Sequence, residues 1–377
     1  MIYLTYGDSY SGVFSSQVID VCNHISSHFN VDVKLICFIP YATYKKDKKK
    51  IKSEYPNALI FPMLPSRSYV WKPYAHFFKF FLRNQKENKI IIGRATFAAN
   101  IALYAKGKRQ KMVYDGRGAE KAQWAEYISK PISEIVGKLE SKAINESDKN
   151  IAVSNELVQH WKKDFNYQKD NSVIIPCTLN SYFSVQFPDE KVIQDKRKEL
   201  GYSSQDIVII FSGGSTDWQV MSKLEENLKG ILYHNKEVKV LFLSKINLED
   251  LNVFEEYKDR LQQFWVLPEE VYEILIVGDY GILFREASIT NKVASPTKFA
   301  EYLAAGLKVI ISDGIGDYSE LIAANKELGI KVKSTSSLEL KKMTYIEKKT
   351  LYNYGIGNFS KSSFNAEYKT IVQEEIK

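Results

Sequence analysis

Short runs of apolar residues alternate with longer amphipathic stretches along most of the chain. The amphipathic stretches predict helices, among them 14–28, 97–106, 122–146, 156–164, 217–234 and 298–305. The apolar runs predict strands at 2–6, 31–38, 58–61, 89–93, 111–114, 150–153, 172–175, 207–211, 238–243, 263–266, 280–284 and 308–311. Runs such as 208–211 are apolar at every position, which is typical of parallel strands covered by helices on both faces. The pattern therefore predicts α/β architecture with parallel sheets.

The alternation breaks once, in the middle of the chain. Residues 176–190 contain two prolines and little periodicity, and the β/α alternation then starts afresh. We predict two doubly wound, Rossmann-like domains, 1–180 and 195–350, with a linker at about 177–195. The last stretch, 361–377, is expected to be a helix. In doubly wound domains ligands bind at the carboxyl ends of the strands, and we expect these ends to face a shared cleft.

Composition and length agree with two globular domains. The 377 residues are 45% hydrophobic and 26% charged, and single cores stop growing at about 250–300 residues. The cysteines, Cys22, Cys37 and Cys177, form no CxxC pair, which argues against a zinc knuckle or a disulfide framework and favours a reducing compartment. We find no signal peptide and no apolar run of about 18 residues, so a cytoplasmic protein is expected.

Charge is concentrated in the first third of the chain. Residues 1–110 hold 17 Lys and Arg against 6 Asp and Glu, a net +11, and the remainder is at −4, which together give the +7 of the whole chain. Such a surface favours an anionic partner, although a merely solvated lysine-rich surface would look the same.

The segment after the strand at 280–284 carries the clearest chemistry. A polar loop leads to a helix that opens at Ser295-Pro296-Thr297, with serine as the expected N-cap and proline in the first turn. Free amides at such a helix start suit a diphosphate, and Lys298 adds a positive charge. Glu301 lies one turn further on the same face, where a carboxylate can accept hydrogen bonds from a ribose diol. An ordinary helix with a Lys–Glu surface pair is the alternative.

The string from Ser295 to Ile310, Ser-Pro-Thr-Lys-x-x-Glu-Tyr-Leu-Ala-x-Gly-x-x-Val-Ile, resembles the donor-binding motif of the GT-B nucleotide-sugar glycosyltransferases, family 4 in the usual classification. The resemblance implies that loop amides hold the donor diphosphate and that Glu301 holds the ribose of a UDP- or GDP-sugar. Family members commonly carry a second glutamate eight residues earlier, where this chain has Val293. Its neighbours Arg285, Glu286 and Asn291 are the candidates to replace that glutamate, and Glu286 is a candidate for the reaction itself.

A second match lies at the start of the second domain. The strand at 207–211 runs into Ser212-Gly213-Gly214, which resembles the family's first phosphate-facing loop in this domain. Basic residues are absent from this loop, so Lys245 or Lys298 would supply the charge. The loop after Trp265-Val266 resembles the nucleobase pocket. A tight strand–helix turn is the alternative for the glycine loop.

Three loops of the first domain follow strands. The loop at 7–17, with Gly12, resembles the one that faces donor and acceptor, although it lacks GxGxxG spacing. Arg94 ends one strand and is predicted on the acceptor side. The Asp-x-Arg-Gly string of another strand end resembles a motif of some bacterial glycosyltransferases. Its residues Asp115 and Arg117, with Glu120, are predicted on the reaction side; a structural Asp–Arg pair is the alternative.

Metal chemistry has no support in the sequence. We find no Asp-x-Asp motif and no cluster of His and Cys, and His24 and His28, four apart on a predicted helix, are interpreted as a surface pair. We expect no metal and no cofactor. Amides, lysine and the helix dipole would then stabilise the leaving nucleoside diphosphate.

Aromatic and basic residues alternate in the stretch at 69–83, and residues 45–52 are lysine-rich. Together they would suit an anionic bilayer. Basic residues among aromatics also describe binders of single-stranded nucleic acid, and a core helix with outward-reaching lysines is a third reading.

These observations lead to one function hypothesis and two alternatives. The chain is expected to be a cytoplasmic, peripheral-membrane glycosyltransferase that moves a hexose from a UDP- or GDP-sugar to a saccharide acceptor, lipid-linked, in surface-polysaccharide assembly. The family resemblance implies retention of anomeric configuration and a last helix, at about 361–377, that packs back on the first domain. The first alternative is a nucleotide-sugar epimerase on the same fold, and the second is a non-enzymatic protein that binds through its basic surface. A nucleic-acid partner is not expected.

Overall fold

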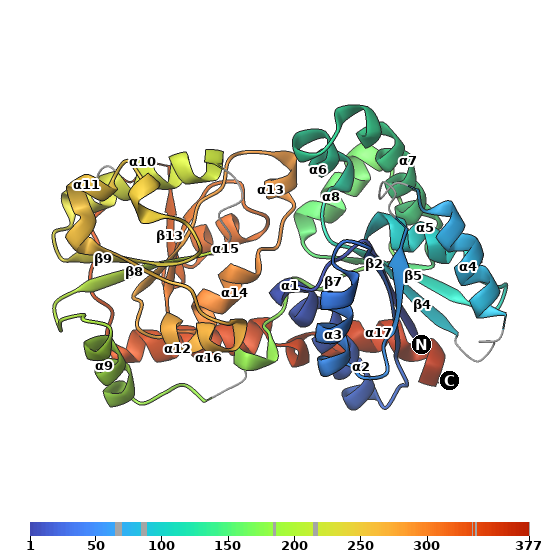
Figure 1. Ribbon diagram of the computed structural model, residues 1–377, viewed down its shortest axis with the longest axis horizontal. Coiled ribbons are helices and arrows are strands. Elements are labelled where there is room, and N and C mark those ends of the chain that lie inside the picture. Colours follow the sequence, from blue (N-terminus) through green and yellow to red (C-terminus); the bar gives the residue numbers. More distant parts are fainter. Residues whose placement is uncertain are drawn as a thin grey trace. The chain divides into compact units, whose positions relative to one another are not determined.

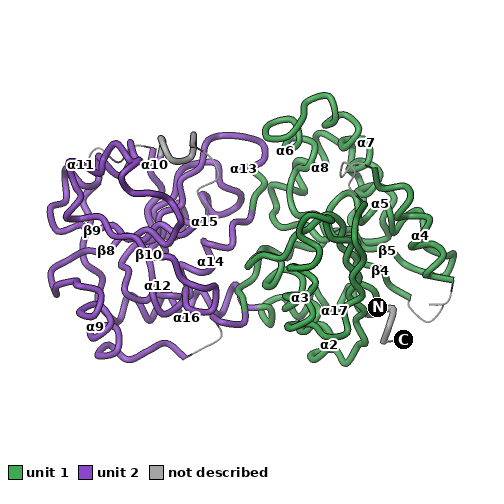
Figure 2. The backbone as a smooth tube through the Cα atoms, in the orientation of Figure 1, with its two compact units in different colours: residues 1–180, 292–294, 361–377 green, residues 181–291, 295–360 purple. Residues whose placement is uncertain are grey.

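The chain forms two compact units (Figures 1 and 2). This computed structural model describes residues 1–64, 70–83, 89–183, 186–213, 218–333, 335 and 338–376, without the side chains of 218–223 and 374–376. The first unit comprises Met1–Asn180, Lys292–Ala294 and Lys361–Lys377, and the second comprises Ser181–Asn291 and Ser295–Ser360. Among the described residues, no helix is both long enough and apolar enough to cross a membrane.

The first unit is built on a parallel sheet whose order is β3-β2-β1-β4-β5-β6-β7 over the described residues. Leu4 of the central strand lies opposite Ile36 on one side and Gly93 on the other. The strands are β1 (Ile2–Tyr6), β2 (Lys34–Pro40), β3 (Leu59–Met63), β4 (Ile90–Arg94), β5 (Lys111–Gly116), β6 (Lys149–Ala152) and β7 (Ser172–Ile174).

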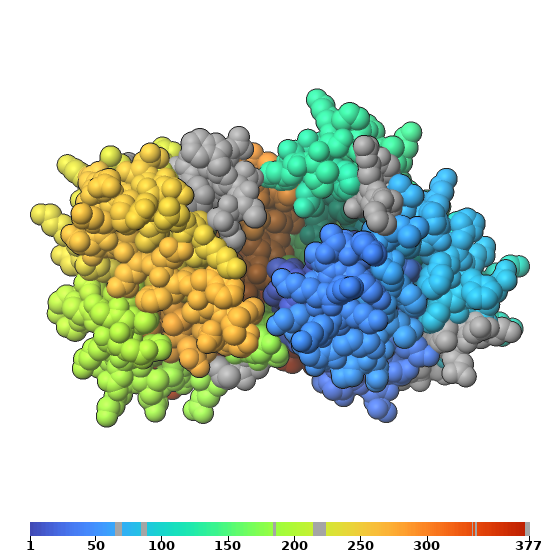
Figure 3. All heavy atoms as spheres, in the orientation of Figure 1, coloured from blue at the N-terminus to red at the C-terminus, as the bar shows by residue number. Residues whose placement is uncertain are grey.

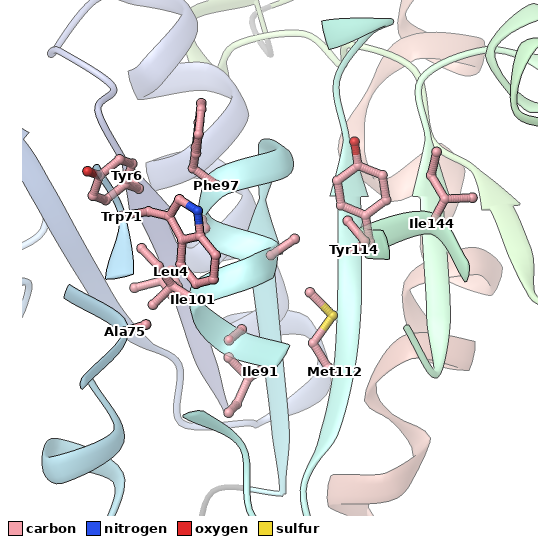
Figure 4. Close-up of a cluster of buried hydrophobic side chains, with 14 of the residues drawn as sticks. Leu4, Tyr6, Trp71, Ala75, Ile91, Phe97, Ile101, Met112, Tyr114 and Ile144 are labelled. Atoms are coloured by element: carbon pink, nitrogen blue, oxygen red, sulfur yellow. The ribbon is translucent and has the colours of Figure 1, made fainter. Parts of the chain in front are cut away.

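Helices cover both faces of this sheet. They are α1 (Gly12–Phe14), the π-helical turn η1 (Ser15–Ile19), α2 (Asp20–Phe29), α3 (Tyr44–Glu54), α4 (Lys72–Leu82), α5 (Ala95–Ala105), α6 (Glu120–Tyr127), α7 (Lys130–Glu146), α8 (Asn155–Phe165) and, from the chain end, η6 (Lys361–Phe364) and α17 (Asn365–Ile376). Because successive strand residues point to opposite faces, Leu4 belongs to a core cluster that includes residues of α4, α5, α7 and α8, whereas Tyr3 belongs to one that includes residues of α2, α3 and α17. Figure 4 shows the first of these clusters, with Leu4 and Ile91 gathered beside Trp71 and Ile101.

The second unit has its own parallel sheet, in the order β10-β9-β8-β11-β12-β13 over the described residues. Its central strands are buried along most of their length, as the all-apolar run at 208–211 predicted. The strands are β8 (Ile207–Ser212), β9 (Val238–Leu243), β10 (Leu261–Phe264), β11 (Tyr280–Leu283), β12 (Lys308–Ser312) and β13 (Gly329–Val332).

The helices of the second unit precede its first strand, connect its strands and follow the last one. They are η2 (Ser181–Phe183), α9 (Glu190–Glu199), α10 (Trp218–His234), η3 (Leu248–Asp250), α11 (Phe254–Tyr257), η4 (Lys258–Arg260), η5 (Pro268–Glu270), α12 (Val271–Leu275), α13 (Ile289–Lys292), α14 (Thr297–Ala304), α15 (Tyr318–Ala324) and α16 (Tyr345–Phe359). Helices α14 and α16 touch closely, because a Cβ on Gly355 would come within 2.5 Å of the backbone nitrogen of Ala304.

The predicted fold class of two parallel α/β sheets is confirmed, and three element predictions need correction. The helix expected at 122–146 is two helices, because Pro131 within a continuous helix would clash with the carbonyl of Tyr127. Strand β13 has only two strongly apolar side chains, Ile330 and Val332, and was not predicted. Part of the expected linker is helical, since α9 begins at Glu190.

Candidate functional sites at the carboxyl ends of the strands

Helix α14 begins at Thr297, and its start differs from the one predicted. Ser295 is buried, and its Oγ lies 2.8 Å from the hydroxyl of Tyr318 in α15. The N-cap position belongs to Pro296, whose side chain makes no capping hydrogen bond. The prediction that Ser295 caps this helix is therefore wrong, because its hydroxyl instead ties the loop to α15.

Lys298 and Glu301 do meet on the outer face of α14. The Nζ of Lys298 lies 2.5 Å from Oε2 of Glu301, and their side chains are 28% and 13% exposed. The first amides of a helix have no acceptor within it, and in this helix Phe299 donates back to the carbonyl of Pro296. The amides of Thr297 and Lys298 therefore stand beside a half-buried ion pair at the helix start.

Tyr302 anchors α14 to the sheet. Its ring covers Gly281 of β11 so closely that a Cβ there would come within 2.3 Å of a ring carbon. Its hydroxyl accepts a 2.9 Å hydrogen bond from the amide of Ser212 and donates a 3.3 Å one to the carbonyl of Ile282. The neighbouring Glu301 is consequently held at a fixed distance from the ends of β8 and β11.

The glycine loop after β8 offers fewer amides than predicted. The amide of Ser212 is bonded to Tyr302, and that of Gly213 donates to the carbonyl of Leu243 at 3.3 Å. Neither amide can donate to a phosphate without breaking its present bond, so these two donor-binding predictions are not supported by the geometry. Gly214, the third predicted residue, lies outside the described residues.

Two further predicted donor contacts lie after β9 and β10. Lys245 is exposed and its ammonium sits 4.2 Å from the centroid of the Trp265 ring. Val266 is half-buried and lies beyond β10, which ends at Phe264. The cation and the indole thus form an exposed cation–π pair beside the predicted nucleobase loop.

The loop after β11 is held by Asn291. The Oδ1 of this buried side chain accepts from Nη1 of Arg285 at 3.1 Å, and its Nδ2 donates to the backbone carbonyl of Glu286 at 3.0 Å. The Glu286 side chain is exposed. Val293, at the position of the family's first glutamate, is buried in the core of the first unit, and its carbonyl accepts from Oγ of Ser154 at 2.7 Å.

In the first unit, Asp115 sits at the centre of a buried charge cluster at the strand ends. Its Oδ2 accepts from the hydroxyl of Tyr3 at 2.5 Å and lies 3.6 Å from Nη1 of Arg94, and its Oδ1 lies 3.3 Å from Nη1 of Arg117. The Asp115 side chain is 3% exposed. Burial and then the Asp115 carboxylate raise the pKa of the Tyr3 hydroxyl. Sequence reasoning placed Asp115 and Arg117 together, and the structure adds Arg94 to them.

Gln17, which sequence reasoning gave no role, joins this cluster to the segment after β7. Its Oε1 accepts from Nη2 of Arg117 and from the amide of Thr178, both at 3.2 Å, and its Nε2 donates to the carbonyl of Thr178 at 2.7 Å. The residue lies in the π-helical turn η1, a distortion often found at functional sites. Hydrophobic periodicity cannot reveal such a turn, so the sequence held no signal for this contact.

Asp8 is a second residue that the sequence did not single out. It follows β1, and its Oδ2 lies 3.7 Å from Nε of Arg94. Burial raises the pKa of Asp8 above its ordinary value. Within the described part of the chain, Oδ2 of Asp8 and Nη1 of Arg94 are buried and have no hydrogen-bond partner. These two atoms therefore carry unused hydrogen-bonding capacity at the ends of β1 and β4.

Glu120 has a structural use. Its Oε1 accepts a 2.5 Å hydrogen bond from the amide of Thr96 in the first turn of α5. Glu140 in turn accepts from the amides of Glu120 and Lys121, at 3.1 and 2.7 Å, at the start of α6. Burial raises the pKa of Glu120 to about 7 and also raises that of Glu140. Both acids thus cap helix starts.

The remaining predicted residues are simpler. Gly12 begins α1 and is exposed, and Oγ of Ser11 caps that turn by accepting from the amide of Phe14 at 3.2 Å. In the part of the chain that the structure describes, no three His, Cys, Asp or Glu residues lie together as a metal site. The rings of His24 and His28 stack with centroids 5.4 Å apart.

The two parallel-sheet units define the GT-B architecture, so the resemblance inferred from the donor motif is confirmed at the level of the fold. The solved structures similar to this chain include a glycosyltransferase from Rickettsia africae, with 16% identity, 99% of this chain and 98% of that one covered, and a TM-score of 0.67. Alr3699/HepE from Anabaena, in complex with UDP and glucose, has 11% identity, 99% coverage of both chains and a TM-score of 0.66.

The similar solved structures also include a galactosyltransferase and a putative epimerase. The lipopolysaccharide outer core galactosyltransferase WaaB has 13% identity, 100% and 99% coverage and a TM-score of 0.64. A putative UDP-N-acetylglucosamine 2-epimerase from Listeria monocytogenes has 7% identity, 98% and 89% coverage and a TM-score of 0.56. At these identities the likeness is one of fold. No protein-family model and no curated protein matches the chain.

Proposed function

We propose that this protein is a glycosyltransferase that moves a sugar from a UDP- or GDP-sugar to a saccharide acceptor. The observation that carries the proposal is the start of α14, where Lys298 and Glu301 share one face and Tyr302 ties that face to the ends of β8 and β11. The same fold holds UDP and glucose in the Anabaena protein, which makes UDP the first nucleotide to test.

In this proposal the donor replaces the internal ion pair of α14. The diphosphate accepts from the amides of Thr297 and Lys298 and from the Lys298 ammonium, and Glu301 accepts hydrogen bonds from the ribose hydroxyls. During transfer the bond between the anomeric carbon and the diphosphate oxygen breaks, the acceptor oxygen forms the new bond to that carbon, and the acceptor's proton passes to the departing diphosphate. The lysine and the helix dipole stabilise the charge that develops on the leaving nucleoside diphosphate. We propose that configuration at the anomeric carbon is retained.

On the first unit we assign Arg94, with Asp8, to the acceptor side, because both keep unused polar atoms at the strand ends. Asp115 and Arg117 are assigned as positioning residues, since their charged atoms contact Tyr3, Arg94, Gln17 and each other. Glu120 is assigned to helix capping.

In the second unit, Glu286 keeps an exposed side chain after β11 and stays a candidate for contacts with the transferred sugar.

We further propose a lipid-linked acceptor and attachment to an anionic bilayer through the first unit. Helix α4 buries Tyr74 and Phe78 but leaves Phe77 and Phe80 44% and 64% exposed. The same helix carries the exposed Lys72 and Lys79, and exposed aromatics beside basic residues are the usual composition of a membrane-surface element. Helix α3, in the blue surface region of Figure 3, packs on the other face of the sheet and adds five exposed lysines to the positive charge of the unit, Lys45, Lys46, Lys48, Lys49 and Lys50. WaaB is named for a lipopolysaccharide, which supports a role in surface-polysaccharide assembly.

Calorimetry with UDP and Glu301→Ala tests the donor site. We expect the variant to lose about 1–3 kcal/mol of binding free energy, the scale of hydrogen bonds to a charged group. The control is Glu199→Ala, which removes the acid of another i, i+3 Lys–Glu pair, at 2.8 Å with Lys196, in the same unit. Equal affinity of both folded variants for UDP would refute the role of Glu301, and no binding of UDP or GDP by the wild type would refute the donor class.

The epimerase remains a second candidate, because a putative epimerase has the same fold. Incubation with UDP-N-acetylglucosamine and no acceptor separates the two functions. A transferase leaves the sugar configuration unchanged apart from slow hydrolysis, whereas an epimerase yields a new sugar that proton NMR detects. Appearance of that sugar would overturn the transferase proposal.

A further inference from the structure

The second unit contains a small polar cavity at the opposite ends of its strands. It has a volume of about 80 Å³ and lies between α9, the residue before β11 and the start of α16. Asp279 precedes β11 and accepts from the amide of Val208, the second residue of β8, at 2.8 Å. The cavity is therefore at the amino ends of strands whose carboxyl ends carry Ser212 and α14.

Arg197 forms one wall of this cavity and is 6% exposed. Its Nη1 donates to the carbonyl of Val277 at 2.6 Å and to Oδ2 of Asp279 at 3.1 Å, and its Nη2 donates to the carbonyl of Asp206 at 2.5 Å. Its Nε is also buried, and no described residue accepts a hydrogen bond from it. The Nε donor of this guanidinium thus remains unused beside the cavity.

Two lysines line the same cavity. Lys348 of α16 is 4% exposed, and its Nζ donates to the carbonyls of Ile276 and Gly278. An ammonium has three donors, so one remains. Lys342 is exposed at the rim and its Nζ donates to the carbonyl of Ser204. Neutral carbonyls satisfy hydrogen bonds but do not neutralise these charges.

Asp279, Asp206 and Glu190 are the acids that act on these cations, and within the described part of the chain only Asp279 forms an ion pair with one of them, Arg197. Asp279 is fully buried and is shared with Arg197, Val208 and the amide of Met343. Glu190 is exposed and accepts from Gln194. Burial lowers the pKa of Lys348 to about 8 and also lowers that of Lys342. A buried positive charge without a counter-charge is costly, and an anion in the cavity would offset that cost.

We propose that this cavity binds a small oxyanion with the size and chemistry of inorganic phosphate, held by Arg197, Lys342 and Lys348. A volume of about 80 Å³ has room for a small oxyanion among these side chains. Nothing in the proposed transferase function requires this site, which lies at the amino ends of the strands. Its occupant would stabilise the second unit by joining α9 to α16 through one ligand.

Titration of the full chain with sodium phosphate, at ionic strength held constant with sodium chloride, tests this site. We expect a saturable rise in Tm and one binding event by calorimetry. Because phosphate could also occupy the donor site, the titration is repeated in Lys298→Gln, which should keep the event. Loss of the event in Lys298→Gln would assign it to the donor site and overturn the proposal.

Two variants then locate the phosphate. Lys342→Gln, at an exposed position, should weaken binding at least tenfold, whereas Lys341→Gln, its exposed neighbour outside the cavity, should not. Lys348→Met should abolish binding and keep the fold, since methionine fills the same volume. Equal phosphate affinity of Lys341→Gln and Lys342→Gln, or a Tm rise that chloride reproduces, would refute the site.

Discussion

The carboxyl ends of the two sheets differ in how their charges are used. In the first unit Asp115 is 3% exposed and is shared among Tyr3, Arg94 and Arg117, and Gln17 extends the network to Thr178. In the second unit Lys298 and Glu301 form a single pair on one helix face, and both are partly exposed. The first set of charges is a buried network of several partners, and the second is one half-buried pair within a single helix.

This difference separates positioning from binding. A buried charge that loses its partner is costly, whereas a single partly exposed pair within one helix contributes less to stability. The first cluster can therefore fix the strand ends and the π-helical turn, but its central carboxylate is not free to take up a ligand. The pair on α14 can open at low cost when a ligand offers both residues a better partner.

The largest effect is expected for Asp115→Asn. The substitution leaves Arg94 and Arg117 buried with less negative charge, which should lower the free energy of unfolding by about 3–5 kcal/mol. Urea denaturation measures it. Asp164→Asn is the control, because that acid is 45% exposed and pairs with His160 at 2.7 Å, and it should cost less than about 1 kcal/mol. Similar losses of unfolding free energy in both variants would mean that the Asp115 cluster contributes no more to stability than an exposed ion pair.

Glu120→Gln tests whether this acid caps a helix or takes part in the reaction. Burial raises the pKa of Glu120 to about 7 in the folded state, so the protonated carboxyl is favoured there. The contribution of this group to the free energy of unfolding is therefore fully present below pH 4.5 and is lost as the pH rises through about 7. Glutamine still accepts from Thr96 and should be more stable than the wild type at pH 8 by about 3 kcal/mol. Urea denaturation at pH 5 and 8 measures the difference, and loss of transfer activity in the folded variant would restore a catalytic role.

Tyr302→Phe tests the anchor of α14. The buried amide of Ser212 loses its acceptor, which should cost about 1–3 kcal/mol of unfolding free energy and weaken UDP binding by shifting Glu301. Tyr272→Phe is the matched control, since among the described residues nothing hydrogen-bonds the buried hydroxyl of Tyr272. That control should be neutral or stabilising in urea denaturation. A neutral Tyr302→Phe would mean that packing on Gly281 alone holds the helix.

The smallest effect on stability is expected for Glu301→Ala. An i, i+3 pair at a partly exposed site contributes less than about 1 kcal/mol, so the variant should unfold at nearly the wild-type urea concentration while UDP affinity falls. A loss of several kcal/mol of unfolding free energy would mean that Glu301, like Asp115, stabilises its unit. The charges at the carboxyl ends of the two sheets would then not differ in this respect.

Most of the strands could be predicted because apolar residues dominate them. Strands β1 and β9 begin and end at the predicted residues, since each run holds a single non-apolar position, Thr5 and Lys239, that does not break it. Strand β13, at the edge of its sheet, was not predicted because two of its four residues, Gly329 and Lys331, interrupt the apolar pattern. The break between α6 and α7 had a visible signal in Pro131, which hydrophobic periodicity alone does not weigh.

Only those site residues could be predicted whose positions are set by the ends of the parallel strands. Arg94 and Asp115 lie at the carboxyl ends of the neighbouring parallel strands β4 and β5, and Arg117 follows β5, so their meeting follows from the topology. The bond between Ser212 and Tyr302 depends on the rotamer of a side chain 90 residues away, and the bond between Ser295 and Tyr318 depends on how α15 packs. Local sequence carries no information on such long-range pairings, so the capping and phosphate roles of Ser295, Ser212 and Gly213 were predicted where the hydrogen bonds had other uses.

The ion pair on α14 has a consequence for selectivity under the proposed function. A ligand that separates Lys298 from Glu301 must compensate both residues at once, because releasing only one leaves the other without its partner. Inorganic phosphate satisfies the lysine alone, and a nucleoside satisfies the glutamate alone. Only a molecule that carries both a phosphate and a ribose can replace the partner of each residue. The first turn of α14 is therefore expected to bind intact nucleotides in preference to phosphate or nucleosides.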